Sequence, residues 1–427
     1  MKNYESTRAV LVGVCTDDRA LDELEKSLDE LERLLDTAGG TCVAKVIQNR
    51  ERPDPRTLIG MGKVCEVSCL CIQEEVGLVV FDEELSPSQI RNLEDEIGGV
   101  RVIDRSMLIL DIFALHAVTR EGKLQVELAQ LKYTAPRLMG HGKEMSRLGG
   151  GIGTRGPGES KLESDRRHMK HRIVALEEEL RTLDKNRQTM RVSRDRSGIP
   201  KIAIVGYTNA GKSTLLNRLT DAGILAEDKL FATLDPTTRK FALPSGDQVL
   251  LTDTVGFIRK LPHHLIKAFK STLDEAVYAD VLMIVIDVSD PEYRAQLDVT
   301  EQLLQELGAA GKPTLYVFNK CDLGVAALPA VGVPAEHDRT VFVSARTGQG
   351  IELLEQILQE IIHAGKRRVT FHIPNANAGA LNTLYQYATV EDVEYGVDEI
   401  LATAVVDRKA HGMMKKYDPD WREPEDD

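Results

Sequence analysis

The chain has 427 residues, of which 42% are hydrophobic and 28% are charged, and its formal net charge is −13. At roughly 100–200 residues per domain, this length predicts three or four domains of soluble globular material. The longest wholly apolar run covers only residues 281–286, and the first ten residues lack the apolar core of a secretory signal. A bilayer span needs ~20 apolar residues, so we expect a cytoplasmic protein with no integral membrane insertion and at most a peripheral membrane association.

Residues 1–118 alternate between strand-like and helix-like patterns. Apolar runs suited to buried strands fall at residues 10–14, 42–47, 77–81 and 100–103. Helical patterns at residues 20–35 and 87–97 separate them. Strands that alternate with helices predict a small parallel sheet. The glycine turn at residues 60–63 could touch a ligand, but we expect a strand-to-helix turn, because a short glycine turn is weak evidence of a site.

Cys65, Cys69 and Cys71 lie close together among only six cysteines. A metal site is one interpretation, but no fourth ligand follows at a spacing typical of zinc. We therefore expect reduced thiols.

Residues 119–197 predict a helical hairpin. Apolar residues recur with 4-3-4-3 spacing in each half, first at Leu124, Leu128, Leu131, Ala135 and Leu138 and then at Met169, Ile173, Leu176, Leu180 and Leu183. Two heptad stripes of matching length can join antiparallel helices. From Arg120 to Ser197 there are 18 Lys and Arg against 11 Asp and Glu. A basic segment in an acidic chain is typical of contact with a polyanion.

Between these helices, residues 140–158 contain 8 glycines among 19 residues. Such a stretch cannot build a core, so it predicts a loop at the hairpin's tip. A plain flexible linker is one interpretation. Nucleic-acid contact is favoured, because the loop joins helices that already pack together and carries Lys143, Arg147 and Arg155.

A phosphate-binding motif follows the strand predicted at residues 201–205. It has the form G-x-x-x-x-G-K-S, opens a helix at 214–219, and consists of Gly206, Tyr207, Thr208, Asn209, Ala210, Gly211, Lys212 and Ser213. Glycines let the loop wrap a phosphate, and amides at the helix start point toward it. We expect Lys212 to pair with the β- and γ-phosphates and Ser213 to bind Mg²⁺.

The strand at residues 249–251 leads into a D-x-x-G motif that consists of Asp253, Thr254, Val255 and Gly256. Asp253 would hold Mg²⁺ through its water shell, and the Gly256 amide would sense the γ-phosphate. The next residue is Phe257, where a glutamine would orient the attacking water. A phenyl ring cannot do this, so we expect slow intrinsic hydrolysis. Packing of Phe257 in the switch is the alternative role and is compatible with this.

A base-recognition motif follows the strand at residues 315–318 and consists of Asn319, Lys320, Cys321 and Asp322. A carboxylate at Asp322 can accept from both N1–H and the 2-amino group of guanine, and adenine offers neither donor. After the strand at 340–343, Ser344, Ala345 and Arg346 fit the last loop, whose backbone reads the base carbonyl. Four motifs in this order, each after a strand, predict a GTPase.

Residues 366–427 predict a small α+β appendage. Its expected strands lie at 369–373, 393–395 and 400–406, its helix lies at 380–387, and the chain ends in an acidic tail.

Over nearly its whole length the chain resembles the HflX family of ribosome-associated GTPases, within the phosphate-loop class. The resemblance rests on FATLDPTTR (231–239), DTVGFIRKLP (253–262), GKLQVELAQLKY (122–133) and GGIGTRGPGE (150–159). It implies an N-terminal α/β domain and a helical hairpin before the GTPase domain. Similar proteins bind the large ribosomal subunit and split stalled or idle ribosomes, often after heat stress.

The resemblance also assigns residues. It makes Thr233 the switch I threonine that binds Mg²⁺ with GTP, whereas spacing alone leaves Thr233, Thr237 and Thr238 open. Its neighbours Phe231, Ala232, Leu234 and Asp235 would then line the nucleotide. Asn209 resembles the asparagine that binds a potassium ion in several GTPases without the glutamine. The expected catalytic residues are Lys212, Thr233, Gly256 and Asn209, and the expected metal residues are Ser213, Thr233 and, through water, Asp253.

The sequence thus predicts an α/β protein with an N-terminal parallel α/β domain (1–118), a helical hairpin (119–197), a P-loop GTPase domain (198–365) and a small α+β domain (366–427). The leading function is a GTPase, monomeric off the ribosome, that binds the large subunit with GTP, dissociates ribosomes and is released by hydrolysis. The alternative is a GTP-dependent enzyme that remodels ribosomal or other structured RNA, with residues 1–118 as a second active site. A third hypothesis, a nucleotide-gated protein adaptor that contacts no RNA, is less favoured, because it leaves the basic segment unexplained.

Overall fold

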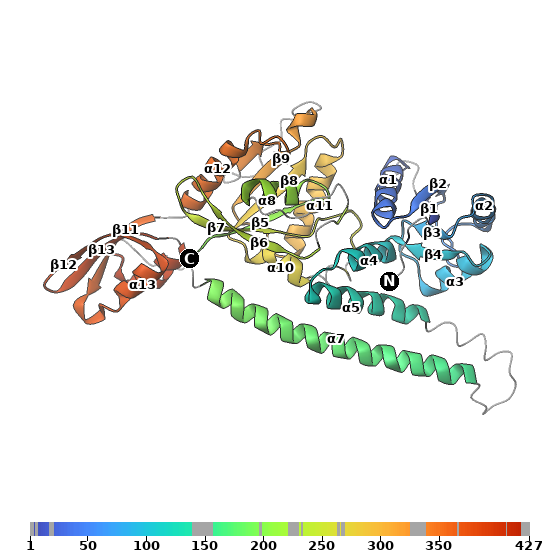
Figure 1. Ribbon diagram of the computed structural model, residues 1–427, viewed down its shortest axis with the longest axis horizontal. Coiled ribbons are helices and arrows are strands. Elements are labelled where there is room, and N and C mark those ends of the chain that lie inside the picture. The colour runs from blue at the N-terminus through green and yellow to red at the C-terminus, as the bar shows by residue number, and fades with distance from the viewer. Residues whose placement is uncertain are drawn as a thin grey trace.

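The structure is a computed structural model that describes residues 4, 7–16, 21–138, 157–195, 199–220, 230–231, 234–262, 265, 270–324, 339–364, 367–406 and 408–419. Three sheets follow one another along an elongated molecule, and a pair of helices runs beside two of them (Figure 1). The mixed α/β fold predicted from the sequence is confirmed. No described helix is both long enough and apolar enough to cross a bilayer.

The N-terminal unit (described residues 4–116) is a four-stranded parallel sheet of order β2-β1-β3-β4. Its strands are β1 (Arg8–Cys15), β2 (Thr41–Asn49), β3 (Leu78–Phe81) and β4 (Arg101–Asp104). One face carries α1 (Leu21–Thr37) and α4 (Arg105–His116), and the other carries α2 (Met61–Gln73) and α3 (Pro87–Glu96). Because both faces are covered, strands such as β3 are apolar throughout. Gly60 is the N-cap residue of α2, so the glycine turn forms a helix start, well after β2 ends at Asn49.

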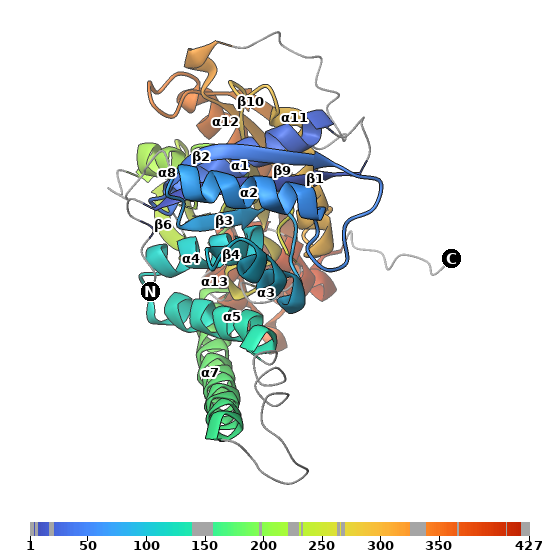
Figure 2. The ribbon, with the colours of Figure 1, turned by 90° about the vertical axis from the view of Figure 1, so that its right-hand side faces the viewer.

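The helical pair consists of α5 (Arg120–Leu138) and α7 (Pro157–Asp195). Helix α5 lies beneath the N-terminal unit, and α7 runs from beneath the central unit to beneath the N-terminal unit (Figures 1 and 2). Ion pairs from Arg172 to Glu127 (2.7 Å) and from Arg187 to Glu121 (2.9 Å) give the antiparallel register. Leu176 of the predicted stripe is fully buried.

The two helices differ in length, because α7 has 39 residues and α5 has 19. Pro157 and Gly158, which we expected in the tip loop, begin α7 instead, since Pro is well tolerated in a first helical turn. The rest of the predicted loop, with Lys143, Arg147 and Arg155, lies outside the described residues.

The central unit (described residues 199–364) is a six-stranded sheet of order β10-β9-β8-β5-β7-β6, in which only β6 is antiparallel to its neighbour. Its strands are β5 (Lys201–Gly206), β6 (Thr237–Ala242), β7 (Gln248–Asp253), β8 (Val281–Asp287), β9 (Thr314–Asn319) and β10 (Arg339–Phe342). One face packs against α8 (Lys212–Thr220) and α12 (Ile351–Ala364), and the other packs against α10 (Lys270–Tyr278) and α11 (Tyr293–Glu306). The carboxyl ends of the parallel strands meet at one edge, where α/β sheets bind ligands.

The C-terminal unit (described residues 367–419) has its own core around Phe371 and Leu384. Its antiparallel sheet has the order β11-β13-β12, with β11 (Arg367–Pro374), β12 (Thr389–Tyr395) and β13 (Glu399–Val406). Helices α13 (Ala380–Tyr387) and α14 (Arg408–Met414) share that core. The unit lies at the opposite end of the molecule from the N-terminal unit (Figure 1).

Candidate nucleotide site and its switch segments

The loop between β5 and α8 needs glycine at two positions. Gly206 has φ +147°, and a Cβ there would lie 2.2 Å from the Val285 carbonyl oxygen. Gly211 has φ +92°, and a Cβ there would lie 2.3 Å from Asn319 Nδ2. Asn209 adopts a left-handed φ of +61°, which Asn tolerates better than most residues. The loop therefore lies tightly against the ends of β8 and β9.

Lys212 is buried beneath this loop, and its Nζ donates to the Tyr207 carbonyl oxygen (2.8 Å). Burial lowers the pKa of Lys212 to about 8, and the nearby charge of Asp253 only partly opposes this shift. A buried ammonium is costly without an anionic partner. The loop is therefore electrostatically suited to an anion such as a nucleotide phosphate.

Ser213 and Asp253 meet at the same edge of the sheet, where Ser213 Oγ donates to Asp253 Oδ2 (2.6 Å). A hydroxyl and a carboxylate are the oxygen ligands that Mg²⁺ prefers, so this pair fits the metal. Gly256 lies close by, since a Cβ there would come within 2.9 Å of Lys212 Nζ and 2.8 Å of the Thr208 Cα. The phosphate-binding motif and the D-x-x-G motif, whose Ser213 and Asp253 are 40 positions apart, thus form one site.

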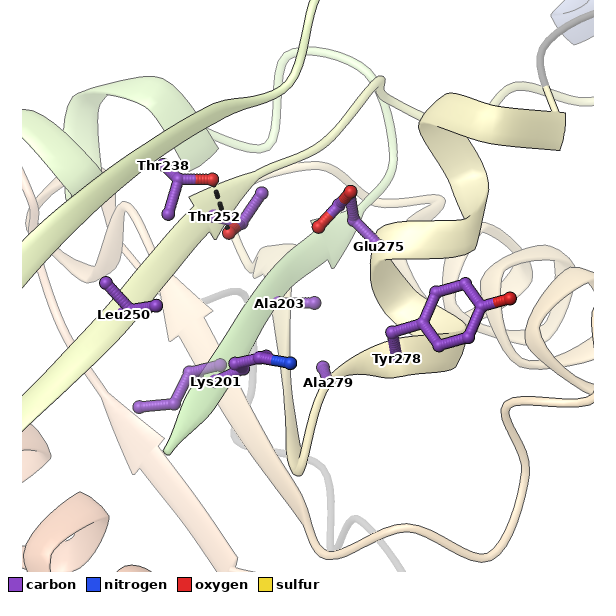
Figure 3. A pocket seen from close by; sticks show the side chains of 9 residues that line it. Lys201, Ala203, Thr238, Leu250, Thr252, Glu275, Tyr278 and Ala279 are labelled. Carbon is purple, nitrogen blue, oxygen red and sulfur yellow. Dashed lines mark hydrogen bonds between the residues drawn. The ribbon is translucent and has the colours of Figure 1, made fainter. Parts of the chain in front are cut away.

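Of the three threonines that spacing left open, Thr233 lies outside the described residues, as does Ala232. Thr237 pairs with Asp253 in the β6–β7 register. The Thr238 hydroxyl lies 3.0 Å from the Thr252 hydroxyl, where both line a small cavity beside α10 with Glu275 and Tyr278 (Figure 3). Thr252 and Asp253 point to opposite faces of the sheet, so the Thr238 side chain lies on the face away from Asp253.

Asn319 joins the phosphate loop to the last loop of the site. Its Nδ2 donates to the Ala210 carbonyl oxygen (2.8 Å), and its Oδ1 accepts from the Ala345 amide (3.0 Å). Lys320 has φ +64°, and its Nζ pairs with Asp287 Oδ2 (2.6 Å). Cys321 and Asp322 follow in the short helix η2 (Cys321–Leu323), where Asp322 is exposed. Ser344 is buried, its Oγ accepts from the Thr347 amide (3.1 Å), and Arg346 is exposed.

Phe257 packs in the central unit's core with 1% of its surface exposed. Its backbone pairs with the phosphate loop, because its amide donates to the Gly206 carbonyl (3.0 Å) and its carbonyl accepts from the Thr208 amide (2.8 Å). The phenyl side chain has no polar group, so it cannot orient a water molecule. Thr254 is held nearby through its hydroxyl, which donates to the Ile204 carbonyl (2.8 Å).

We call residues 230–231 with 234–235, and residues 255–261, the switch segments, and both segments pack on the N-terminal unit. Phe231 meets Phe113 edge-on, with ring centroids 4.7 Å apart. The Leu230 amide donates to Thr37 Oγ1 (3.3 Å). Leu234, Val255 and Ile258 belong to the same buried cluster as α1 and α4. The side chains of Phe231 and Leu234, expected beside the nucleotide, are thus buried against another unit.

Asp235 contacts the start of α5 rather than the phosphate loop. Its Oδ2 accepts from the amides of Val118 (3.0 Å) and Thr119 (2.8 Å), and its Oδ1 accepts from the Thr119 hydroxyl (2.5 Å). A Cβ on Gly122 would lie 2.5 Å from Asp235 Oδ1, so glycine makes room for the carboxylate. An anion at a helix N-terminus is favourable, and Asp235 therefore stabilises the first turn of α5.

A buried charge cluster joins the same units, and sequence reasoning did not find it. Arg105, 2% exposed, pairs with Glu30 and with Asp82 (2.7 Å), which also accepts from Lys260. The Tyr207 hydroxyl donates to Glu30 and accepts from the Arg259 amide (2.8 Å).

This cluster shifts the pKa values of two neighbouring acids in opposite directions. Burial alone would raise the pKa of Asp82, but the charges of Arg105 and Lys260 hold it below its usual range. Burial and the charge of Asp82 raise the pKa of Glu83 to about 7. The cluster therefore keeps a charged and a readily protonated carboxyl side by side.

Three family models match the chain in succession. Their descriptions are "GTP-binding GTPase N-terminal" for residues 25–114, "GTP-binding GTPase Middle Region" for 116–194 and "50S ribosome-binding GTPase" for 201–320.

Individual relatives match most of the chain. It is 52% identical over 404 residues to GTPase HflX of Lacrimispora saccharolytica, with 93% of each chain covered. It is 46% identical over 416 residues to GTPase HflX of Caldanaerobacter subterraneus, with 97% of this chain and 94% of that protein covered. Among solved structures, a GTP-binding protein from Sulfolobus solfataricus in complex with GDP is 27% identical, covers 83% of this chain and 98% of its own, and superposes with a TM-score of 0.45.

Proposed function

The chain belongs to the HflX family of GTPases, and we propose that its GTP-bound form binds the large ribosomal subunit and dissociates stalled or idle ribosomes. Hydrolysis of GTP to GDP would then release the protein. In this proposal residues 1–118, 119–197, 198–365 and 366–427 are four working units, of which the third hydrolyses GTP. Dissociation draws on binding energy and steric clash, so hydrolysis resets the cycle.

The proposed nucleotide site uses the loops that meet at the edge of the central sheet. Residues 206–213 would surround the phosphates, with Lys212 as their buried cation and the Gly256 amide at the γ-phosphate. Ser213, Thr233 and, through water, Asp253 would hold Mg²⁺, which neutralises phosphate charge. Residues 319–322 and 344–346 would hold guanine. The short Ser213–Asp253 distance and the brace at Asn319 support this assignment.

The observation that carries the ribosomal role is the position of the switch segments. Residues that rearrange with the nucleotide in GTPases lie here between the phosphate loop and the rest of the molecule. Asp235 bonds to the base of α5, and Phe231 packs on Phe113 of the N-terminal unit. A change at the nucleotide can therefore alter how the helical pair is held.

The helical pair also offers the charge that ribosomal RNA requires. Exposed cations line α7 at Arg166, Arg167, Lys170, Arg181 and Lys185. Lys and Arg at a phosphate surface release counterions, which favours RNA binding. We propose that α5, α7 and the glycine-rich segment between them reach into ribosomal RNA.

The test is light scattering of whole ribosomes mixed with the protein at two salt concentrations. We expect splitting with GTP or a non-hydrolysable analogue, no splitting with GDP, and slow release from the large subunit with the analogue. Replacing residues 140–156 by a short turn should abolish splitting while GTP binding stays intact. Full splitting by that variant would make the glycine tract a linker, because loop closure changes by only ~0.6 kcal/mol per doubling of length. RNA unwinding without splitting would favour the RNA-remodelling alternative.

A further inference from the structure

The C-terminal unit carries the β12–β13 hairpin, whose turn is fixed by hydrogen bonds. At the β12–β13 connection the Gly396 amide donates to the Glu399 carbonyl oxygen (2.9 Å). Asn375 fixes the turn from the side, because its Nδ2 donates to the Val397 carbonyl (2.8 Å) and its amide donates to the Asp398 carbonyl (3.1 Å). The turn is therefore a rigid element.

This rigid turn presents apolar side chains to solvent. Val397 leaves 96% of its surface exposed and the adjacent Tyr395 leaves 73% exposed. Gly396 and Asp398 are usual hairpin-turn residues, because they suit both the backbone geometry and water, but Val397 between them is not. An aliphatic and an aromatic side chain on a rigid turn are instead what a docking contact needs, since burying them gains free energy and orders little backbone.

The hairpin is also acidic. Residues 369–406 contain no Lys or Arg and five acidic residues, which are Glu391, Asp392, Glu394, Asp398 and Glu399. Arg368 pairs with Glu391 (2.7 Å) and His372 contacts Glu399 (3.2 Å). Among the residues that the structure describes, Glu394 and Asp398 have no cationic partner. Charge can protect an edge strand such as β12 from unwanted pairing, but protection does not account for the apolar turn.

We propose that the β12–β13 hairpin docks a protein whose surface is basic and has an apolar depression for Val397 and Tyr395. Nucleic acid is a poor occupant, because its phosphates would meet the hairpin's carboxylates. A basic protein complements both the charge and the apolar turn. If the proposed function holds, on which this last step rests, the partner is a basic protein of the large ribosomal subunit. In Figure 1 the unit that carries β12 lies at the end of the molecule, away from the tip-side end of α7.

The direct test places a photo-cross-linking amino acid at position 397 of the full chain. The protein is bound to purified large subunits with a non-hydrolysable GTP analogue and irradiated. We expect a cross-link to a basic protein. A cross-link to RNA, or none from protein that co-sediments, would overturn the inference. The control carries the same probe at Ile72, which is 76% exposed on α2.

Variants give a second measurement. Val397→Asp combined with Glu394→Lys and Asp398→Lys should weaken binding to large subunits about tenfold, because each exposed contact contributes a fraction of a kcal/mol. Ile72→Asp is the matched control and should bind normally. Unchanged affinity of the triple variant would contradict the docking role.

If the wild-type protein fails to co-sediment at all, the proposed function fails, and the inference is tested separately. Proteins stripped of RNA from large subunits are passed over the immobilised full chain. Retention of a basic protein by the wild type but not by the triple variant would support the docking role, and equal retention would overturn it.

Discussion

Asp322 is exposed to solvent, whereas Asn319 of the same motif is 2% exposed. Asn319 is held by hydrogen bonds to the Ala210 carbonyl and the Ala345 amide. Asp322→Asn should weaken GTP binding by about 2 kcal/mol, or roughly thirtyfold, because an amide cannot accept both guanine donors. The same variant should bind xanthosine triphosphate better than wild type does. Competition binding of GTP, XTP and ATP to the full chain measures this, with the exposed Asp298→Asn as control. Wild-type protein that held ATP as tightly as GTP would show that residues 319–322 do not read the base.

Asn209 leads to a prediction about ions, because Phe257 cannot orient water. If Asn209 helps to bind potassium, GTP turnover should be slow in sodium buffer and faster in potassium. Asn209→Ala should remove this difference and still bind GTP. Turnover is measured by phosphate release at constant ionic strength, and nucleotide affinity is measured in parallel. Equal rates in both salts would leave Asn209 as a residue that suits the left-handed backbone of the loop.

At the scale of elements, α5 depends on a residue far along the chain from its first turn. Asp235→Asn removes the anion that accepts from the Val118 and Thr119 amides, which should cost about 1 kcal/mol at this helix start. Amide hydrogen exchange in the first turn of α5 should then rise. Thr119→Val should have a comparable effect, because it removes the hydroxyl that donates to Asp235 and also accepts from the Gly122 amide (2.9 Å).

The same exchange measurement tests whether the nucleotide state reaches the helix. If Asp235 leaves the start of α5 on GTP binding, the amide hydrogens of this turn should exchange in wild-type protein with a GTP analogue as fast as they do in Asp235→Asn. Protection that is identical with GDP and with the analogue would show that the contact does not respond to the nucleotide.

The elements that the sequence predicts are those with local signals. Apolar runs locate all four strands of the N-terminal sheet and all strands of the C-terminal sheet. Helix α3 begins at Pro87, and Ser86 and Gln89 form a capping box at its start. Helices α2 and α4 are not located individually by such patterns. Helix α4 is buried almost all round, so it lacks the polar face that makes a helical period visible.

Contacts between units could not be predicted in the same way. Tyr207 and Glu30 are 177 positions apart, and Lys260 and Asp82 are 178 apart. No periodicity links such residues, since their meeting depends on how two folded units dock. The nucleotide loops are predictable because each follows its own strand and carries its own short motif. The sequence indicates the switch segments only as neighbours of the nucleotide, and it does not reveal their packing on the N-terminal unit.

At the scale of the whole molecule, the N-terminal and central units share one buried cluster, whereas the C-terminal unit has its own. We therefore expect calorimetry to show the first two units unfolding together and the C-terminal unit separately. Phe113→Ala should lower the shared transition, by about 3–5 kcal/mol of stability, because it opens a cavity between the units. Phe371→Ala, at a fully buried position, should lower only the other transition. Independent melting of the first two units would contradict the shared core.

The length of α7 has a mechanical consequence. Its 39 residues, at about 1.5 Å each, make a straight rod of roughly 58 Å. It ends at Asp195, shortly before β5 begins at Lys201 and leads into the phosphate loop. A tilt of about 5° at that end would sweep the other end through roughly 5 Å. A lever of this proportion multiplies displacement and divides force. We infer that the end of α7 near the phosphate loop sets the direction of the helix. The force that separates two ribosomal subunits would then arise from contacts at the other end of α7.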